Sequence, residues 1–109
     1  MSNSKYHAVP TVVDNVRFAS KREAARYGEL KLLVKAGRVR NLKLHPRFAL
    51  HVKGIVVGHY VADFTFNEKV GPFDVWSFVV EDTKGVRTQM FRWKAKHMKA
   101  EYGIGIREV

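Results

Sequence analysis

Three polar residues have the types and the spacing that metal-assisted chemistry needs, namely Asp63, Asp82 and Lys84. Asp82 and Lys84 end the most hydrophobic segment of the chain, and residues two apart on a strand project from the same face. Asp63 lies in YVADFTF, which we expect to pair with that segment because the connection between the two is short. Two carboxylates and an ammonium group would therefore meet at the ends of neighbouring strands.

Such a group of side chains suits the hydrolysis of a phosphodiester bond. Mg²⁺ or Mn²⁺ binds oxygen ligands, and Mg²⁺ is typically held by one or two carboxylates together with a substrate phosphate. The bound ion polarises the phosphoryl oxygen and lowers the pKa of a coordinated water, while a nearby lysine orients that water and stabilises developing charge. The simpler interpretation is a surface ion pair between Asp82 and Lys84, with Asp63 bonded only to turn amides.

A third carboxylate is available on the helix that we expect over residues 21–36. Glu23 falls within the apolar arc of this helix, whereas Glu29 lies about 120° away from it. An inward carboxylate on an apolar stripe is costly unless it is paired or bound to a metal, so we favour Glu23 as the third ligand. Its alternative role is that of capping-box partner to Ser20.

Two neighbouring acidic residues could supply the carboxylate that precedes Lys84 on the strand. A bulge could bring Glu81 into the site in place of Asp82. We favour Asp82, because strand alternation puts it on the same face as Lys84.

The elements that position these residues can be predicted from capping and turn residues. An Asp-Asn turn predicts a hairpin of Thr11–Val13 and Val16–Phe18. Ser20, followed three residues later by Glu23, predicts the start of the first helix, and Gly37 predicts its end.

After this helix the hydrophobic period changes to two, which predicts strands. The strand segments are VRNLKLHPRFALHV, IVVGHYVADFTF and FDVWSFVVEDTK, of which Pro46 divides the first. RTQMFRWKAKHMKAEYG returns to helical spacing between Thr88 and Gly103, and IGIREV is expected to form a last strand. The order is therefore hairpin, helix, three or four strands, helix and strand. It predicts an α+β or mixed α/β fold in which a central mixed sheet is flanked by two helices.

The composition indicates one folded domain with a polyanionic partner. The 109 residues contain 20 Lys+Arg and 10 Asp+Glu, which gives a formal net charge of +10. An excess of this size favours nucleic acid, because each neutralised phosphate releases condensed counterions. We expect residues 1–10 to be a flexible arm and residues 11–109 to form a single domain.

Basic residues are concentrated directly after the proposed site. The residues that we expect to contact nucleic acid are Arg87, Gln89, Arg92, Lys94, Lys96 and Lys99. The simpler interpretation of this cluster is a solvated helix face.

Other chemistries lack support in the sequence. The chain has no cysteine, and its five histidines are too dispersed for a zinc motif, so we interpret them as ordinary strand, loop and helix residues. No apolar stretch is long enough to span a bilayer, and the N-terminus has no signal-peptide core, so we expect a cytoplasmic protein without a membrane partner.

The pattern of an acidic strand residue, then Asp82-Thr83-Lys84 on the next strand, resembles the PD-(D/E)XK nuclease superfamily. Five segments resemble, more narrowly, a small phage-encoded branch akin to Holliday-junction resolvases: FASKREAARYGELKLLVKAG, HPRFAL, YVADF, VVEDTKG and YGIGIREV. The likeness runs from the hairpin to the C-terminus. One departure is Ala62, which stands where the superfamily name has proline.

The resemblance implies a restriction-endonuclease-like core and a role for each matching residue. Asp63 and Asp82 would be metal ligands, Lys84 the catalytic lysine and Glu23 the helix carboxylate. The expected function is a Mg²⁺- or Mn²⁺-dependent endonuclease of a phage, acting in the host cytoplasm on branched DNA as a homodimer. The alternatives are a nuclease with little structure preference, a non-catalytic nucleic-acid-binding module of the same fold, and a structural basic protein.

Overall fold

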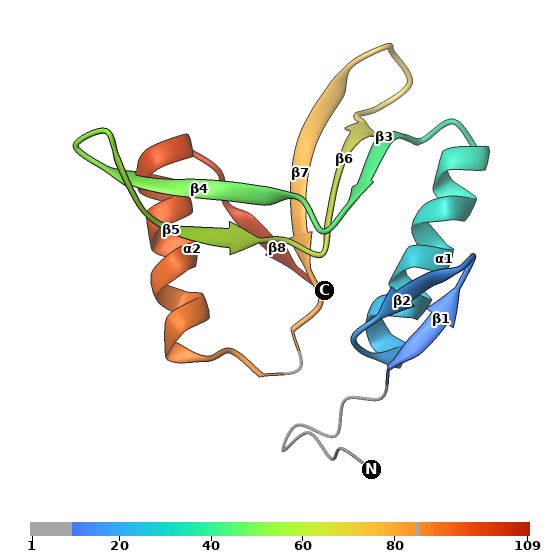
Figure 1. Ribbon diagram of the computed structural model, residues 1–109. Helices are drawn as coiled ribbons and strands as arrows, with labels where there is room; N and C mark the ends of the chain where they lie inside the picture. The colour runs from blue at the N-terminus through green and yellow to red at the C-terminus, as the bar shows by residue number, and fades with distance from the viewer. Residues whose placement is uncertain (1–9, 85) are drawn as a thin grey trace.

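The computed structural model describes residues 10–84 and 86–109, and Figure 1 shows their arrangement. The predicted flexible arm, apart from Pro10, lies outside the described residues. A hairpin comes first, formed by β1 (Thr11–Val13) and β2 (Val16–Phe18). Both turn residues have positive φ, as a two-residue turn between twisted strands requires, so the predicted hairpin is confirmed.

Helix α1 (Lys21–Lys35) follows the hairpin. Its first turn is capped by Ser20, whose Oγ accepts a hydrogen bond from the backbone N–H of Glu23 at 3.1 Å. Gly37 adopts a φ of +74° just after the helix, a conformation that favours glycine. The helix predicted over residues 21–36 is therefore confirmed, with its end one residue earlier.

The central sheet is mixed and has four strands in the order β3-β6-β7-β8. The strands are β3 (Val39–Leu44), β6 (Phe64–Lys69), β7 (Trp76–Asp82) and β8 (Ile106–Glu108). β3, β6 and β7 pair antiparallel, while β8 runs parallel to β7 after the crossover through α2 (Gln89–Tyr102). The predicted mixed sheet with two flanking helices is confirmed, as is the pairing of the Asp63 segment with the segment of Asp82.

A second pair of strands leaves this sheet at a bend. β4 (Arg47–Val52) and β5 (Ile55–Val61) form a separate antiparallel ribbon that extends over α2 (Figure 1). Leu44 pairs with Phe64 before the bend and Arg47 pairs with Val61 after it, so one long hairpin is folded at its middle.

The prediction of one continuous strand through IVVGHYVADFTF is therefore wrong, and five strands rather than three or four separate the helices. Pro46 lacks a backbone N–H and therefore interrupts the hydrogen-bonded pairing of the two arms of the hairpin. The opposite arm bends at the same level, between β5 and β6. Two hydrogen bonds hold the bends together: His45 N–H donates to Asp63 O at 3.0 Å, and Ala62 N–H donates to Pro46 O at 3.1 Å.

Two hydrophobic clusters cover the two faces of the central sheet. α1 and the first hairpin pack on one face with Phe64, Phe66 and Val79. α2 and the β4–β5 ribbon pack on the other with Val80, in a cluster that includes Phe91 and Met98 of α2. Successive residues of β7 thus face opposite helices, which places Glu81 on the α1 side and Asp82 on the α2 side. Within the described residues, no helix is long and apolar enough to cross a membrane.

Candidate metal centre

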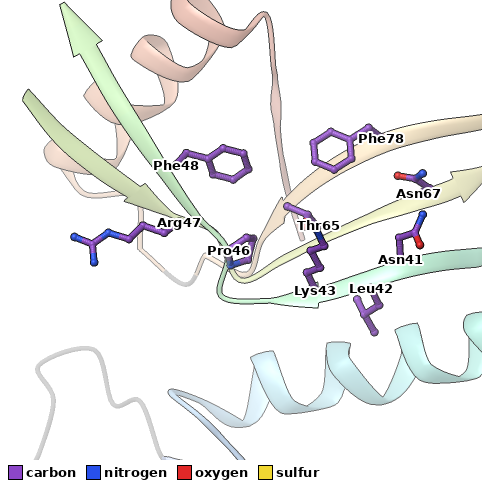
Figure 2. Close-up of a pocket in the computed structure, with 9 residues that line it drawn as sticks. All are labelled: Asn41, Leu42, Lys43, Pro46, Arg47, Phe48, Thr65, Asn67 and Phe78. Carbon is purple, nitrogen blue, oxygen red and sulfur yellow. The ribbon is translucent and has the colours of Figure 1, made fainter. Parts of the chain in front are cut away.

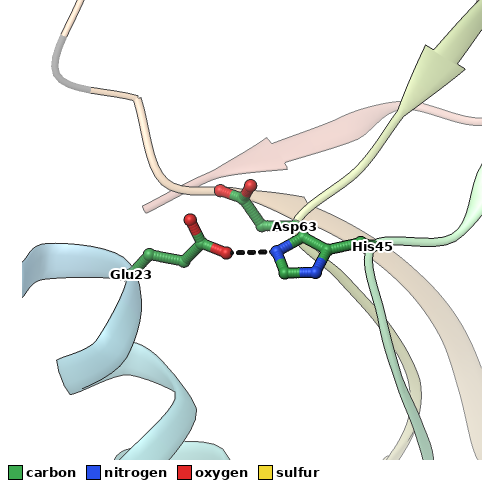
Figure 3. A group of neighbouring side chains, drawn as sticks. All are labelled: Glu23, His45 and Asp63. Carbon is green, nitrogen blue, oxygen red and sulfur yellow. Dashed lines mark hydrogen bonds and ion pairs between the residues drawn. The ribbon is translucent and has the colours of Figure 1, made fainter. Parts of the chain in front are cut away.

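Three side chains from separate elements converge where the long hairpin bends. Glu23 comes from α1, His45 from the bend between β3 and β4, and Asp63 from the bend between β5 and β6 (Figure 3). Each offers one ligand atom, and these atoms all lie within 4.8 Å of one another. Because the two bends are hydrogen-bonded to each other, the fold fixes His45 and Asp63 as a pair and brings the helix carboxylate against them.

Glu23 is directed inward, as the helical arc predicts. Its residue is 3% exposed, and its Oε1 lies 2.6 Å from Nε2 of His45. Glu29, the alternative on the same helix, has a side chain that is 62% exposed and lies 3.2 Å from Arg26. The carboxylate of Glu23 therefore belongs to the cluster, whereas that of Glu29 lies at the surface.

Asp63 connects this cluster with the end of β7. Its Oδ2 accepts hydrogen bonds from the backbone N–H and the Oγ1 hydroxyl of Thr83, both at 2.7 Å. Its own N–H donates to the carbonyl of Glu81 at 3.2 Å. The carboxylate is therefore held firmly in orientation next to Asp82-Thr83-Lys84.

Asp82 is a fully buried carboxylate with one oxygen that lacks a partner. Its Oδ2 accepts a hydrogen bond from the Tyr60 hydroxyl and lies 3.4 Å from Nζ of Lys84. Its Oδ1 is buried and has no hydrogen-bond partner in the described part of the chain. A buried oxygen of this kind is a strong acceptor that a cation or an ordered water would satisfy.

The raised pKa of Asp82 also indicates a negative charge that lacks a sufficient positive partner. Burial, which has the largest effect, and the neighbouring carboxylate of Asp63 together raise the pKa of Asp82 to about 6, against the lowering effects of Tyr60 and Lys84. Burial and the charge of Asp82 also raise the pKa of the Tyr60 hydroxyl, which therefore stays a donor. Asp82 is thus a carboxylate whose negative charge its surroundings do not fully compensate.

Lys84 lies on the same side as Asp82, as strand alternation predicts. Its side chain is 27% exposed, and its Nζ also lies 4.5 Å from the centre of the Phe91 ring of α2. The ammonium group is therefore positioned from two sides and remains accessible to solvent.

Glu81 points away from the cluster into a separate ion pair. Its two carboxylate oxygens accept hydrogen bonds from Nε and Nη2 of Arg26 at 2.7 and 2.8 Å. A bidentate pair of this kind satisfies the buried carboxylate and joins α1 to β7. The structure thus separates the two acids of β7: Glu81 binds Arg26, whereas Asp82 faces Lys84.

The residues predicted to contact nucleic acid lie on α2 and directly before it. Arg87 is exposed and pairs with Glu108 at 3.1 Å, and Lys99 donates to the carbonyl of Gly103 at 3.5 Å. Of the remaining predicted residues, Lys94 is half-buried and the others are exposed: Gln89, Arg92 and Lys96.

His45 is the residue of the cluster that sequence reasoning missed. The sequence predicts an ordinary residue here, because the five histidines are dispersed without the spacing of a zinc site. No short motif joins His45 to Glu23 or Asp63, which lie far from it in sequence. A signal was present in the His-Pro pair between two strand segments. His45 adopts a φ of +52°, and a non-glycine residue in this conformation at a bend is a reason to examine its surroundings.

The donor atoms of this region fit a hard divalent cation. Glu23 and Asp63 offer carboxylate oxygens within the cluster, together with the imidazole of His45. Asp82 is not one of these three residues: it lies beside Asp63 on the α2 side of β7, where its buried Oδ1 has no hydrogen-bond partner among the described residues. The imidazole of His45 suits Mn²⁺ and other transition metals better than Mg²⁺. The close contact of His45 with Glu23 means that a bound ion would have to share this carboxylate or displace the imidazole from it.

Comparison with known proteins gives a family and nothing more specific. Residues 3–106 match the family described as "Protein of unknown function (DUF1064)". No curated protein and no solved structure matches the chain. Because the family model spans nearly the whole sequence, the chain belongs to the DUF1064 family.

Proposed function

We propose that this protein is a metal-dependent DNA endonuclease that hydrolyses phosphodiester bonds. The observation that carries the proposal is the surroundings of Asp82: a buried carboxylate with an unpartnered oxygen, influenced by Asp63 and 3.4 Å from the ammonium group of Lys84. Uncompensated acids beside a fixed cation, with strongly shifted pKa values, are typical of functional sites.

In this proposal Asp63 and Asp82 hold the metal, with Glu23 as the third carboxylate. A divalent cation such as Mg²⁺ or Mn²⁺ supplies Lewis-acid polarisation of the phosphate and activation of a water when bound. The hydrogen bonds from Thr83 hold the Asp63 carboxylate in a fixed orientation, and the imidazole of His45 lies against the carboxylate of Glu23. The protein therefore maintains the ligand geometry before any substrate arrives.

Lys84 has the role of orienting the attacking water and stabilising charge on the phosphate. Its Nζ is held between Asp82 and the Phe91 ring, so it approaches the scissile group with little loss of side-chain freedom. Loss of this ammonium group removes an interaction needed mainly in the transition state.

The order of elements supports a restriction-endonuclease-like core. If the β4–β5 ribbon is regarded as the outer half of the bent hairpin, the remaining order is α1-β3-β6-β7-α2-β8. This is the order that the resemblance to PD-(D/E)XK nucleases implies. The proposal inherits from that resemblance a phage protein that acts in the host cytoplasm.

Branched DNA is the substrate that we propose, as for a junction resolvase. Resolution of a four-way junction needs two symmetric nicks, so the active form would be a C₂ homodimer. The net charge of +10 and the basic residues on and before α2 suit the phosphate-rich surface of such a substrate.

The second candidate is a nucleic-acid-binding module without catalysis. It is favoured by the contacts already made within the site, because Glu23 is bonded to His45 and Asp63 to Thr83. In this case the acids stabilise the bend of the hairpin and the basic surface alone contacts DNA.

Cleavage of defined DNA distinguishes the two candidates. Branched, nicked and linear duplexes are incubated with the parent protein, Lys84→Ala and Lys35→Ala, in Mg²⁺, Mn²⁺ or EDTA. Lys35 is an exposed lysine in the last turn of α1 and serves as the matched control. The nuclease proposal expects branched DNA to be cut in both metals by the parent and Lys35→Ala, and at least about 100-fold more slowly by Lys84→Ala. Equal products from Lys84→Ala and parent, or products in EDTA, would reject the site.

A further inference from the structure

A groove lies on the open part of the central sheet, on the side that faces away from α1. It measures about 430 Å³ and lies between the β4 strand and the surface of β3, β6 and β7 (Figure 2). The groove exists because the hairpin folds away at the bend, so α2 and the ribbon cover only the part of this face near Asp82. The lining residues are Asn41, Leu42, Lys43, Pro46, Arg47, Phe48, Thr65, Asn67 and Phe78.

One exposed and two half-buried aromatic rings lie on or beside this surface. Phe78 of β7 is 54% exposed, although an apolar ring on a sheet face is normally covered. Figure 2 shows Phe48 of β4 on the opposite wall of the groove. Farther along β7, the guanidinium of Arg40 lies 4.0 Å from the centre of the Trp76 ring, and the indole N–H of Trp76 donates to Asp74. This face therefore offers one exposed flat ring, that of Phe78, beside rings that are held by other contacts.

The polar side chains of the groove are cationic or neutral. Lys43 and Arg47 are exposed, and neither forms an ion pair within residues 10–84 and 86–109. None of the lining residues is acidic, while Asn41 and Asn67 supply amide donors and acceptors. Unpaired cations beside an exposed ring and amide groups suit the phosphates, base face and base edge of an unpaired nucleotide.

We propose that this groove binds a single-stranded segment of nucleic acid. A base stacks on Phe78, the amides of Asn41 and Asn67 bond to its edge, and the backbone lies against Lys43 and Arg47. A duplex does not fit this role, because its bases are stacked on one another and cannot reach a ring on the sheet surface.

This inference rests on the proposed function and specifies its substrate. Pro46, which lines the groove, directly follows His45, and Thr65, which also lines it, comes two residues after Asp63. Phe78 lies on the same sheet face as Asp82. An unpaired strand in the groove would therefore lead toward the metal centre. Branch points and flaps contain such unpaired segments.

The test is the affinity of the full chain for a labelled mixed-sequence oligonucleotide, measured by fluorescence anisotropy in EDTA so that cleavage cannot interfere. Single-stranded DNA, single-stranded RNA and the matching DNA duplex are compared. Phe78→Ala is expected to weaken binding of the single strands about tenfold, and Phe78→Tyr to restore it. Phe73→Ala is the matched control, because Phe73 is 75% exposed and does not line the groove.

The charge contribution is tested with the double variant Lys43→Ala/Arg47→Ala. Its slope of log affinity against log salt is expected to become shallower by about 1 to 2, as the loss of two phosphate contacts predicts. Equal affinity of Phe78→Ala and Phe73→Ala for single strands would overturn the proposal, as would competition by polyglutamate as effective as that by unlabelled oligonucleotide. Single-strand binding by a protein that does not cut branched DNA in Mg²⁺ or Mn²⁺ would reject the nuclease proposal and leave the groove supported.

Discussion

At the residue scale, Asp82 is the least satisfied group of the site. It is fully buried, yet only one of its oxygens is hydrogen-bonded by the described residues. A buried charged group with an unpaired acceptor costs free energy of folding, and the nearby carboxylate of Asp63 adds to that cost. A divalent cation between these carboxylates would offset both effects, which links metal binding to stability.

The metal-free protein should therefore lose stability as the pH rises through the titration of Asp82. An unfolded aspartate has a pKa of about 4, whereas the pKa of Asp82 in the folded protein is raised to about 6. Between these values the folded state binds a proton that the unfolded state has released, so unfolding becomes easier with increasing pH. Denaturant unfolding of the parent and Asp82→Asn in EDTA at pH 4.5 and pH 7 measures the difference. We expect the parent to lose about 1–2 kcal/mol more than the variant.

The same pair of proteins reports metal binding without any substrate. At pH 7, Mn²⁺ or Mg²⁺ should raise the melting temperature of the parent and leave that of Asp82→Asn nearly unchanged. An equal shift in both proteins would place the bound ion elsewhere.

At the element scale, the bend of the long hairpin brings the site together. It aligns His45 with Asp63, and the packing of α1 on the sheet adds Glu23. Helix boundaries, the first hairpin and the pairing of β6 with β7 could be predicted, because caps, turn residues and short connections act locally. The bend between β5 and β6 could not be predicted, because no proline or glycine interrupts the sequence there. The chain bends at that point only because the paired strand carries Pro46. The role of His45 could not be predicted either, because the residues that it contacts come from elements distant in sequence.

The attachment of α1 to β7 depends on one buried ion pair, which gives a stability prediction. Glu81 is 0% exposed, and Arg26 binds it in bidentate fashion. Arg26→Ala should lower the free energy of unfolding by about 3 kcal/mol, because it leaves a buried carboxylate without its partner. Chemical denaturation measures this loss.

Glu29→Ala is the matched control, since it removes only the exposed contact of Arg26 at 3.2 Å. Its cost should stay below about 1 kcal/mol. Comparable losses in the two variants would contradict a special role for the Arg26–Glu81 pair.

At the scale of the whole molecule, the protein is flat, open and strongly basic. Its principal extents are 42 × 39 × 20 Å, and its radius of gyration is 15.2 Å, compared with about 13 Å for a compact domain of similar length. The β4–β5 ribbon accounts for this openness, because it leaves the central sheet at the bend (Figure 1). A flat molecule with a net charge of +10 presents a large surface to a polyanion, with the acidic site and the groove on connected parts of it.

The most direct measurement is the single-turnover rate of cleavage of a branched DNA in Mg²⁺, by the parent and by Asp63→Asn and Asp82→Asn. Each variant is first checked for folding and for unchanged or tighter DNA binding. The account predicts Mg²⁺-dependent nicks by the parent and a loss of at least about 1,000-fold in each variant, because each removes a negatively charged metal ligand. Cleavage by either variant at the rate of the parent, or a purified parent that binds DNA but never cuts it, would contradict the account.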